Sequence, residues 1–205
     1  MSGLHLVFEG PDSVGKSTQI ELVKNLIESL GFEVIITKEP GGTELGQHLR
    51  NILLDSDLDI DYKAETLLMA ADRAQHVSKK IVPLLKENKV VLSDRYIPSS
   101  LVYQGIVRGV GVDLVNEINM FAVGKHKPDL ILCFDLEDDA AKQRMSSTPD
   151  RIEREGDEFA QRIREAYREL QVKYNWQRVD ANGTQQQVFN RIKNLIEPLL
   201  LNHSN

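Results

Sequence analysis

The chain has 205 residues, a length that suits one compact domain, and 41% of them are apolar, as in ordinary globular cores. Its formal net charge of -6 argues against binding to nucleic acid, because such proteins usually carry an excess of positive charge. One cysteine, a start without a signal-peptide pattern and the lack of an apolar run of membrane length predict a cytoplasmic protein that does not bind membranes.

Short apolar runs and longer amphipathic patterns alternate along the first half of the chain. Residues 4–9 predict a strand, and a helix follows whose apolar positions run from Ile20 to Leu30. Residues 33–37 predict a second strand, and residues 45–54 a second helix. A longer helix at 62–86 has its apolar positions at Leu67, Ala71, Ala74, Val77 and Ile81, and we expect Pro83 to kink or end it.

The second half continues the alternation. Strands are expected at 90–93, 130–134 and 176–179, and helices around 99–104, 113–123, 137–145, 159–174 and 188–199. Five strands separated by helices predict an α/β fold with a five-stranded parallel sheet that helices flank on both faces. In such a fold, ligands bind at the carboxyl ends of the strands. We expect residues 1–205 to form a single domain.

The segment after the first strand matches the phosphate-loop pattern G-x-x-x-x-G-K-[ST] through Gly10, Gly15, Lys16 and Ser17. Glycines let the backbone N–H groups close around phosphate oxygens, and the following helix points its positive end at them. Lys16 would neutralise the β- and γ-phosphates, and the Ser17 hydroxyl would reach Mg²⁺. A chance glycine turn is the alternative, but the strand before the loop and the helix after it favour ATP binding.

Asp94 and Arg95 follow the third expected strand. An acid at this place can hold Mg²⁺ or its waters, and the planar fork of an arginine can grip phosphate. The alternative is a helix-capping aspartate beside a surface arginine. Asp135 also follows a strand and is a second candidate for the metal-binding acid, although a helix cap is the favoured interpretation there.

Two further segments carry residues that suit a nucleotide. Met69 and Arg73 lie four residues apart, so an apolar side chain and a cation share one face of the expected helix. Spacing by itself favours the alternative, a core methionine beside a solvated arginine. Tyr103 and Gln104 offer a ring and an amide, and they could also be ordinary surface residues.

A polar break at residues 146–156 interrupts the helical pattern and is bracketed by Arg144, Arg151 and Arg154. A lid with arginines would exclude water and stabilise charge on a transferred phosphoryl group. A solvated loop, in which nearby acids pair with these arginines, is the alternative that spacing favours.

Taken together, these segments resemble the thymidylate kinase family, in its bacterial-type branch, over nearly the whole chain. The matching segments are Phe8-Glu9-Gly10, Gly15-Lys16-Ser17-Thr18, Lys38-Glu39-Pro40-Gly41-Gly42-Thr43, Asp94-Arg95-Tyr96, Ser99, Tyr103-Gln104-Gly105, Lys127-Pro128-Asp129-Leu130 and Asp150-Arg151-Ile152-Glu153. The phosphate loop occurs in many families, whereas its combination with the Glu-Pro-Gly-Gly-Thr turn and the Asp-Arg-Tyr segment is far more specific.

The resemblance implies that the γ-phosphoryl group of MgATP passes to dTMP, giving dTDP and ADP, in a P-loop kinase that is usually a homodimer. It implies an ATP site at Gly10, Pro11, Asp12, Ser13, Val14, Gly15, Lys16, Ser17, Thr18 and Arg144, with catalytic roles for Lys16, Arg95 and Arg151. It implies Mg²⁺ near Ser17 and Asp94. The implied dTMP site consists of Asp12, Glu39, Pro40, Arg50, Met69, Arg73, Arg95, Ser99, Ser100, Tyr103 and Gln104.

Within the dTMP site, the resemblance assigns individual roles. Asp12 meets the sugar 3′-hydroxyl, Arg73 and Arg95 hold the phosphate, and Tyr103 crowds out a 2′-hydroxyl. Ser100 and Gln104 read the edge of the thymine. Two positions depart from the usual pattern: Ser13 replaces the loop arginine of the eukaryotic-type branch, and Met69 stands where a phenylalanine usually stacks on thymine.

Three alternatives stay open at the level of sequence. A kinase for another nucleotide would show equal turnover with other nucleoside monophosphates. A GTP-dependent switch protein would need a guanine motif, and Asn88-Lys89-Val90-Val91 lacks its closing acid. A binding module with an inactive phosphate loop would be indifferent to Lys16→Ala.

Overall fold

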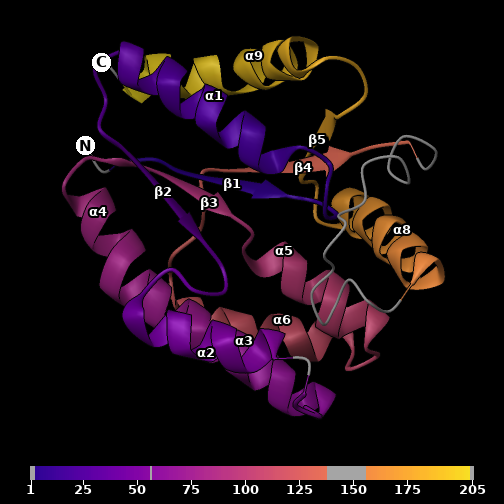
Figure 1. The fold of residues 1–205 in the computed structure, drawn as a ribbon. Coiled ribbons are helices and arrows are strands. Elements are labelled where there is room, and N and C mark those ends of the chain that lie inside the picture. Colours follow the sequence, from indigo (N-terminus) through magenta and orange to yellow (C-terminus); the bar gives the residue numbers. More distant parts are fainter. Residues whose placement is uncertain (1–2, 56, 138–155, 204–205) are drawn as a thin grey trace.

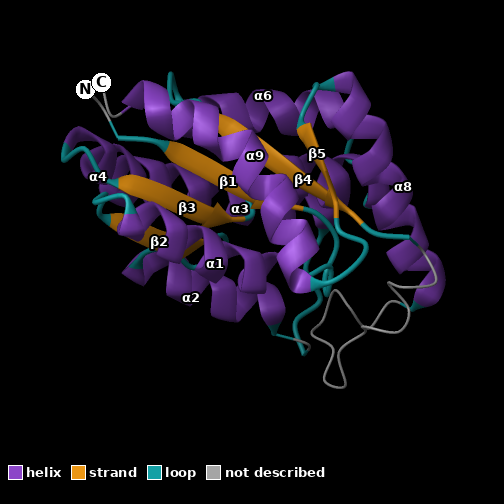
Figure 2. Ribbon diagram, turned by 90° about the horizontal axis from the view of Figure 1, so that it is seen from above, coloured by secondary structure: helices purple, strands orange, loops and turns teal. Residues whose placement is uncertain are grey.

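The apolar runs of the sequence form one parallel sheet in a computed structural model, which describes residues 3–55, 57–137 and 156–203. The strands lie in the order β2-β3-β1-β4-β5 (Figures 1 and 2). Their bounds are β1 (His5–Glu9), β2 (Val34–Lys38), β3 (Val90–Asp94), β4 (Leu130–Asp135) and β5 (Gln177–Asp180). All five strands were predicted, and the predicted fold class is confirmed.

The helices fill the segments between the strands, as the amphipathic patterns predict. Their bounds are α1 (Lys16–Ser29), α2 (Glu44–Leu54), α3 (Tyr62–His76), η1 (Val77–Ile81), α4 (Val82–Lys86), α5 (Ile97–Ser100), η2 (Leu101–Val107), α6 (Val112–Val123), α8 (Asp157–Lys173) and α9 (Gln185–His203). The helix predicted at 137–145 lies, after Glu137, outside the described residues, and so does the polar break up to residue 155. Among the described residues, no helix has the length and apolar character needed to cross a bilayer.

Helices cover both faces of the sheet because alternate strand residues point to opposite sides. Leu6 and Phe8 of β1 pack into a core with residues of α1 and α9, whereas Val7 packs with Val77 and Ile81 on the other side. Figure 1 shows α1 and α9 above the sheet, with α2 to α6 below it. The buried strands carry almost continuous apolar runs for this reason.

The helical stretch predicted at 62–86 does not end at Pro83. It continues to Lys86, and the departure from α-helix comes earlier, in the π-helical segment η1 at Val77–Ile81. Pro83 is tolerated because it occupies the first turn of α4, where a missing N–H costs little. A second π-helical segment, η2, carries Tyr103 and Gln104. Such segments are rare and often mark functional sites.

The buried face of α3 is not the predicted apolar one. Leu67 and Ala71 are exposed, whereas Glu65, Asp72, Arg73 and His76 are buried. The polar face can be buried because each of these side chains has a hydrogen-bond or ion-pair partner on another element. Apolar periodicity therefore identified the helix and misplaced its buried face.

Strand order brings the candidate site residues to one edge of the sheet. β1 lies between β3 and β4, where the chain connections change direction, and crevices form at such points. The parallel register pairs Phe8 with Asp94, so the end of β3 lies beside the start of the segment that follows β1. The strand ends thus place Asp94 and Arg95 next to Gly10.

Candidate functional site

The segment Gly10–Ser17 joins β1 to α1 as a tight loop. Gly10 and Gly15 have φ values of 137° and 98°, which side chains rarely adopt, and a Cβ on Gly10 would lie 2.7 Å from the Phe134 carbonyl oxygen. The Lys16 ammonium donates to the carbonyl oxygens of Gly10 and Pro11, at 2.9 and 2.7 Å. Its charge is therefore held inside the loop.

Lys16 is buried, and burial together with the nearby positive charge of Arg95 lowers the pKa of its ammonium to about 8. The carboxylates of Asp12 and Asp94 oppose this shift without cancelling it. Two cations this close together favour the arrival of an anion.

Asp94 and Ser17 line the same cavity of about 370 Å³, beside α1 and the Gly41-Gly42 turn. The Asp94 Oδ1 atom is buried and has no hydrogen-bond partner among the described residues. A carboxylate with an unpartnered oxygen and a serine that line one cavity supply oxygen atoms of the kind that a hard cation prefers.

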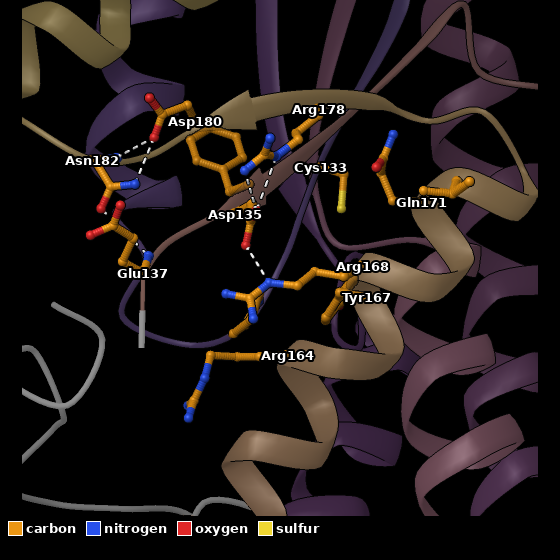
Figure 3. Close-up of a pocket in the computed structure, with 13 residues that line it drawn as sticks. Cys133, Asp135, Glu137, Arg164, Tyr167, Arg168, Gln171, Arg178, Asp180 and Asn182 are labelled. Carbon is orange, nitrogen blue, oxygen red and sulfur yellow. Dashed lines mark hydrogen bonds and ion pairs between the residues drawn. The ribbon is translucent and has the colours of Figure 1, made fainter. Parts of the chain in front are cut away.

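Asp135, the other candidate acid, lies elsewhere. It faces a cavity of about 550 Å³ between β4, β5 and α8, and Figure 3 shows it between Arg168 and Arg178. Its carboxylate accepts from Arg168 Nε at 2.9 Å and from Arg178 Nη2 at 2.7 Å. Ser17 does not line this larger cavity, so the structure favours Asp94 over Asp135 as the acid beside the phosphate loop.

A second cavity adjoins the phosphate loop on the side of α3 and η2. The eleven residues predicted for the dTMP site all line it, together with Leu54, which was not predicted. They are Asp12, Glu39, Pro40, Arg50, Met69, Arg73, Arg95, Ser99, Ser100, Tyr103 and Gln104. We call it the acceptor cavity. The fold therefore gathers residues of α2, α3, α5 and η2, and of the segments that directly follow β1, β2 and β3, around one space.

Arg95 stands between the acceptor cavity and the phosphate loop. It is one of four non-glycine residues with positive φ, at 71°, in the part of the chain that the structure describes. Its Nη1 donates to the Gly10 carbonyl oxygen at 3.3 Å, and its Nη2 donates to Asp12 Oδ1. Lys16 and Arg95 thus share the Gly10 carbonyl.

Asp12 links the loop to the acceptor cavity. Its second oxygen, Oδ2, accepts from the Tyr103 hydroxyl at 3.2 Å, and Arg95 lies over the Tyr103 ring, 5.5 Å from its centroid. Burial raises the pKa of Asp12, but the charges of Arg95 and Lys16 outweigh it and leave that pKa lowered. Asp12 is therefore an anion that aligns the arginine and the tyrosine.

Arg73 is held more completely than Arg95. Its Nε donates to Glu39 Oε2 at 2.7 Å, its Nη1 to Ser100 and Asn119, and its Nη2 to the Tyr96 carbonyl oxygen at 2.8 Å. A guanidinium has five N–H groups, and these contacts use four of them. One N–H is left for a ligand, so a two-pronged grip on phosphate would require breaking a contact.

The turn at Glu39–Gly42 forms a fixed wall of the acceptor cavity. Asp72 accepts from the Gly41 N–H at 3.0 Å, His76 Nδ1 lies 2.8 Å from Glu39 Oε1, and Lys80 donates to the Gly42 carbonyl oxygen at 2.9 Å. Gln47 and Arg50 of α2 donate to the carbonyls of Gly41 and Pro40. Two helices therefore hold this turn from both sides.

Comparison with known proteins bears on this arrangement of two cavities around one loop. The family model for thymidylate kinase matches residues 8–192. A thymidylate kinase of Finegoldia magna is 42% identical over 192 residues, which cover 92% of this chain and 95% of that protein. One of Caldicellulosiruptor saccharolyticus is 40% identical over 203 residues, covering 98% of each. The chain belongs to the thymidylate kinase family.

A member of the thymidylate kinase family is a nucleoside monophosphate kinase, and the chain is accordingly a phosphotransferase that phosphorylates dTMP to dTDP in dTTP synthesis. The predicted family is confirmed. The geometry adds which residues surround each cavity, and it leaves their individual roles as proposals.

Sequence reasoning missed several thymidylate kinase residues around the acceptor cavity. Glu9 belongs to a matching segment but received no role, and Tyr167 lies in the helix predicted at 159–174, also without a role. Glu65 accepts from the Gln104 amide at 2.9 Å, and Asn119 accepts from Arg73. A buried acid on an apolar strand, as Glu9 is, was the available signal. Arg144 and Arg151 lie outside the described residues.

Proposed function

We propose that Lys16 and the amides of Gly10–Thr18 bind the phosphates of ATP, and that Arg95 with Arg50 binds the phosphate of dTMP in the acceptor cavity. One observation carries this proposal: Lys16 Nζ and Arg95 Nη1 both donate to the Gly10 carbonyl oxygen, at 2.9 and 3.3 Å. A cation of the donor site and a cation of the acceptor site therefore lie side by side, as transfer between two phosphates requires.

Arg73 takes a different part in this proposal from the one that the resemblance implies. With one N–H to spare, it suits a single hydrogen bond to the acceptor nucleotide, and its neighbours Ser100 and Gln104 suit the edge of a base. Met69 supplies the apolar wall of the same cavity. Tyr103 and Asp12 face the sugar.

Mg²⁺ fits between Ser17 and Asp94, because an unpartnered carboxylate oxygen and a hydroxyl face one cavity there. The described residues contain no group of three or more His, Cys, Asp or Glu side chains arranged for a metal. The ion would therefore arrive with ATP, whose phosphate oxygens complete its coordination. When bound, it neutralises charge on the transferred group.

The reaction needs no general base in the protein. The acceptor is a phosphate whose second pKa is about 6, so it is largely a dianion at neutral pH. The remaining difficulty is repulsion between two anions, which Lys16 and Arg95 reduce, since both cations lie at the Gly10 carbonyl oxygen. We assign the further charge to Arg151 and contact with adenine to Arg144, both by family resemblance.

An acceptor assay tests the substrate assignment. Purified protein with MgATP is given dTMP, dUMP, dCMP or dGMP, and ADP release is followed under identical conditions. We expect dTMP to give the highest kcat/KM. Turnover with dCMP or dGMP equal to that with dTMP would refute the assignment, and full activity of Lys16→Ala would refute the use of the phosphate loop.

We further propose that the chain works as one kinase domain, as a homodimer and in the cytoplasm. Exposed apolar side chains on α3 and α6, two helices that pack together, support a second copy as the partner: Leu67, Leu114, Met120 and Phe121. Phe121 is 91% exposed, an unusual state for so large an apolar ring. The single cysteine, which is buried and unpaired with another cysteine, suits a reducing compartment.

The dimer is tested by one substitution on this surface. Phe121→Glu should convert the dimer to a monomer, which light scattering coupled to gel filtration would detect, because a carboxylate cannot be buried unpaired. Glu21→Gln on α1, on the opposite side of the sheet, is the control. A wild-type monomer at micromolar concentration would contradict the proposal.

A further inference from the structure

Glu9 is a buried carboxylate that the proposed reaction leaves without a role. It ends β1 directly before the phosphate loop, and its side chain is 0% exposed. Its Oε1 accepts from the N–H groups of Tyr96 and Ser99, at 2.6 and 3.3 Å. Its Oε2 accepts from the hydroxyls of Ser99 and Tyr167, at 2.7 and 3.0 Å. These donors are what a buried carboxylate requires.

The two hydroxyls that donate to Glu9 also accept from Arg95. The Arg95 Nη1 atom lies 3.0 Å from Ser99 Oγ and 3.2 Å from Tyr167 Oη. A hydroxyl has one hydrogen and two lone pairs, so each can accept from the guanidinium and donate toward the carboxylate. The two hydroxyl oxygens are 2.9 Å apart. Through either hydroxyl, hydrogen bonds are donated in the direction from Arg95 to Glu9.

This arrangement determines where the Arg95 guanidinium can point. Nη1 donates to three oxygens, which belong to Gly10 in the loop after β1, to Ser99 of α5 and to Tyr167 of α8. Nη2 is thereby directed to Asp12 and the acceptor cavity. The positive φ of Arg95 is a costly conformation, and such conformations persist where surrounding contacts over-determine them.

We propose that Glu9, acting through the hydroxyls of Ser99 and Tyr167, is a positioning residue that holds Arg95 in place to bind the acceptor's phosphate. This inference rests on the proposed role of Arg95. Tyr167 comes from α8, far along the chain from β1 and β3, so the acceptor site depends on how α8 packs against the sheet. Glu9 and Tyr167 touch Arg95 or its partners and need not touch the substrate.

The decisive variant is Tyr167→Phe, which removes one oxygen and keeps the ring in the core. We expect kcat/KM for dTMP to fall about tenfold, the usual cost of one hydrogen bond to a charged group. KM for ATP should change by less than about twofold. Tyr174→Phe is the matched control, because that ring lies on the same chain segment and stacks on Trp176, 5.6 Å away. Melting temperatures show whether each variant is folded.

A double-mutant cycle with Arg95→Lys separates positioning from general support of the fold. If Tyr167 acts through Arg95, the tenfold loss should shrink to less than about threefold in the Arg95→Lys background. Equal losses in both backgrounds would overturn the inference and leave the proposed function standing. Unchanged dTMP kinetics in Arg95→Lys would overturn the phosphate role of Arg95, and the inference with it.

Glu9→Gln tests the charge of Glu9. The pair Ser99→Ala and Ser99→Thr tests the hydroxyl that lies between Glu9 and Arg95. A glutamine would present N–H groups to hydroxyls or amides that already donate, so KM for dTMP should rise as in Tyr167→Phe. Ser99→Thr keeps the hydroxyl and should restore most of the activity that Ser99→Ala loses. If Glu9→Gln does not fold, the serine pair decides: equal activity of Ser99→Ala and Ser99→Thr would contradict the proposal.

Discussion

At the scale of single residues, the site is organised by charged side chains that hold one another. Lys16, Arg95 and Asp12 are mutually close, and each shifts the pKa of another. Arg73 uses four of its N–H groups on protein atoms. These groups are therefore oriented before a nucleotide arrives, and little reorganisation is needed during transfer.

The lowered pKa of Lys16 predicts how activity depends on pH. Because burial and the charge of Arg95 bring that pKa to about 8, the ammonium loses its proton as the pH rises through this value. We expect kcat/KM for ATP, which reports the free enzyme, to decline above about pH 8. Bound phosphate would restore the charge, so kcat itself should hold to higher pH.

Stopped-time assays between pH 6.5 and about pH 10 would measure this profile, with Lys16→Arg as the comparison, since arginine stays charged throughout. A kcat/KM for ATP that is flat across pH 8 in the wild type would contradict the assignment of Lys16. A decline of equal midpoint in Lys16→Arg would assign it to another group.

At the scale of elements, α2 matters because it carries Gln47 and Arg50 to the turn at Glu39–Gly42. Its start is fixed by Thr43, whose Oγ1 accepts from the Gly46 N–H at 3.0 Å. Thr43→Ala should lower the free energy of unfolding by about 1 kcal/mol, the usual cost of a lost N-cap. KM for dTMP should rise with it, because Arg50 would be held less firmly.

Urea unfolding of Thr43→Ala beside Thr43→Ser measures this effect, since serine keeps the capping hydroxyl. Comparable losses in the two variants would show that packing of the threonine methyl group, and not the cap, stabilises α2.

Most elements could be predicted because apolar periodicity reports burial directly. All five strands were predicted, and the signal was clearest for β1, β3 and β4, which carry buried apolar residues on both faces. The face that α3 buries could not be predicted, because its buried side chains are polar. Their partners, such as Glu39 and Gln104, come from other parts of the chain. The π-helical segments η1 and η2 also escaped, because their local sequence is compatible with an ordinary α-helix.

The candidate site was predictable where it follows sequence motifs. The phosphate loop and the turn at residues 39–42 are contiguous and specific. Glu9 and Tyr167, in contrast, meet across 158 positions of the chain, a pairing that no local pattern encodes. Residue types suggested which chemistry is present, and the fold was needed to show which hydroxyl serves which charge.

At the scale of the whole molecule, a histidine pair at the start of the central strand β1 links stability to pH. His5 Nδ1 lies 2.9 Å from His126 Nε2, and His5 Nε2 lies 2.8 Å from Ser93 Oγ. Burial lowers the pKa of both histidines, and for His5 the nearby His126 and His76 lower it further, while Asp129 opposes the shift of His126. As the pH falls, these histidines therefore bind protons more readily in the unfolded chain than in the folded chain.

The pair should accordingly stabilise the fold fully above about pH 6.5, the ordinary histidine pKa, and progressively less as the pH falls below it. Glu9 and Asp72 have raised pKa values and act with the opposite sign. The informative quantity is thus the difference between the unfolding free energies at pH 7.5 and pH 5.5, each measured by urea titration. This free energy should fall less in His126→Gln than in the wild type. Exposed His48→Gln is the control, and parallel curves for all three proteins would refute the prediction.

The π-helical winding of Val77–Ile81 has a consequence for how the chain can change in length. Asp72, Arg73, His76 and Lys80 reach one short turn from a single helical stretch that includes this winding. A π-helical turn holds one residue more than the α-helical turn that it replaces, so a deletion of one residue from Val77–Ile81 can be absorbed by rewinding to α-helix, and the later side chains keep their faces. A deletion of one residue between Asp72 and His76, in the α-helical part, would instead turn every later side chain by about 100° around the helix axis and take Lys80 from the Gly42 carbonyl. Single-residue deletions between relatives in this stretch should therefore fall within residues 77–81 and be absent from residues 72–76.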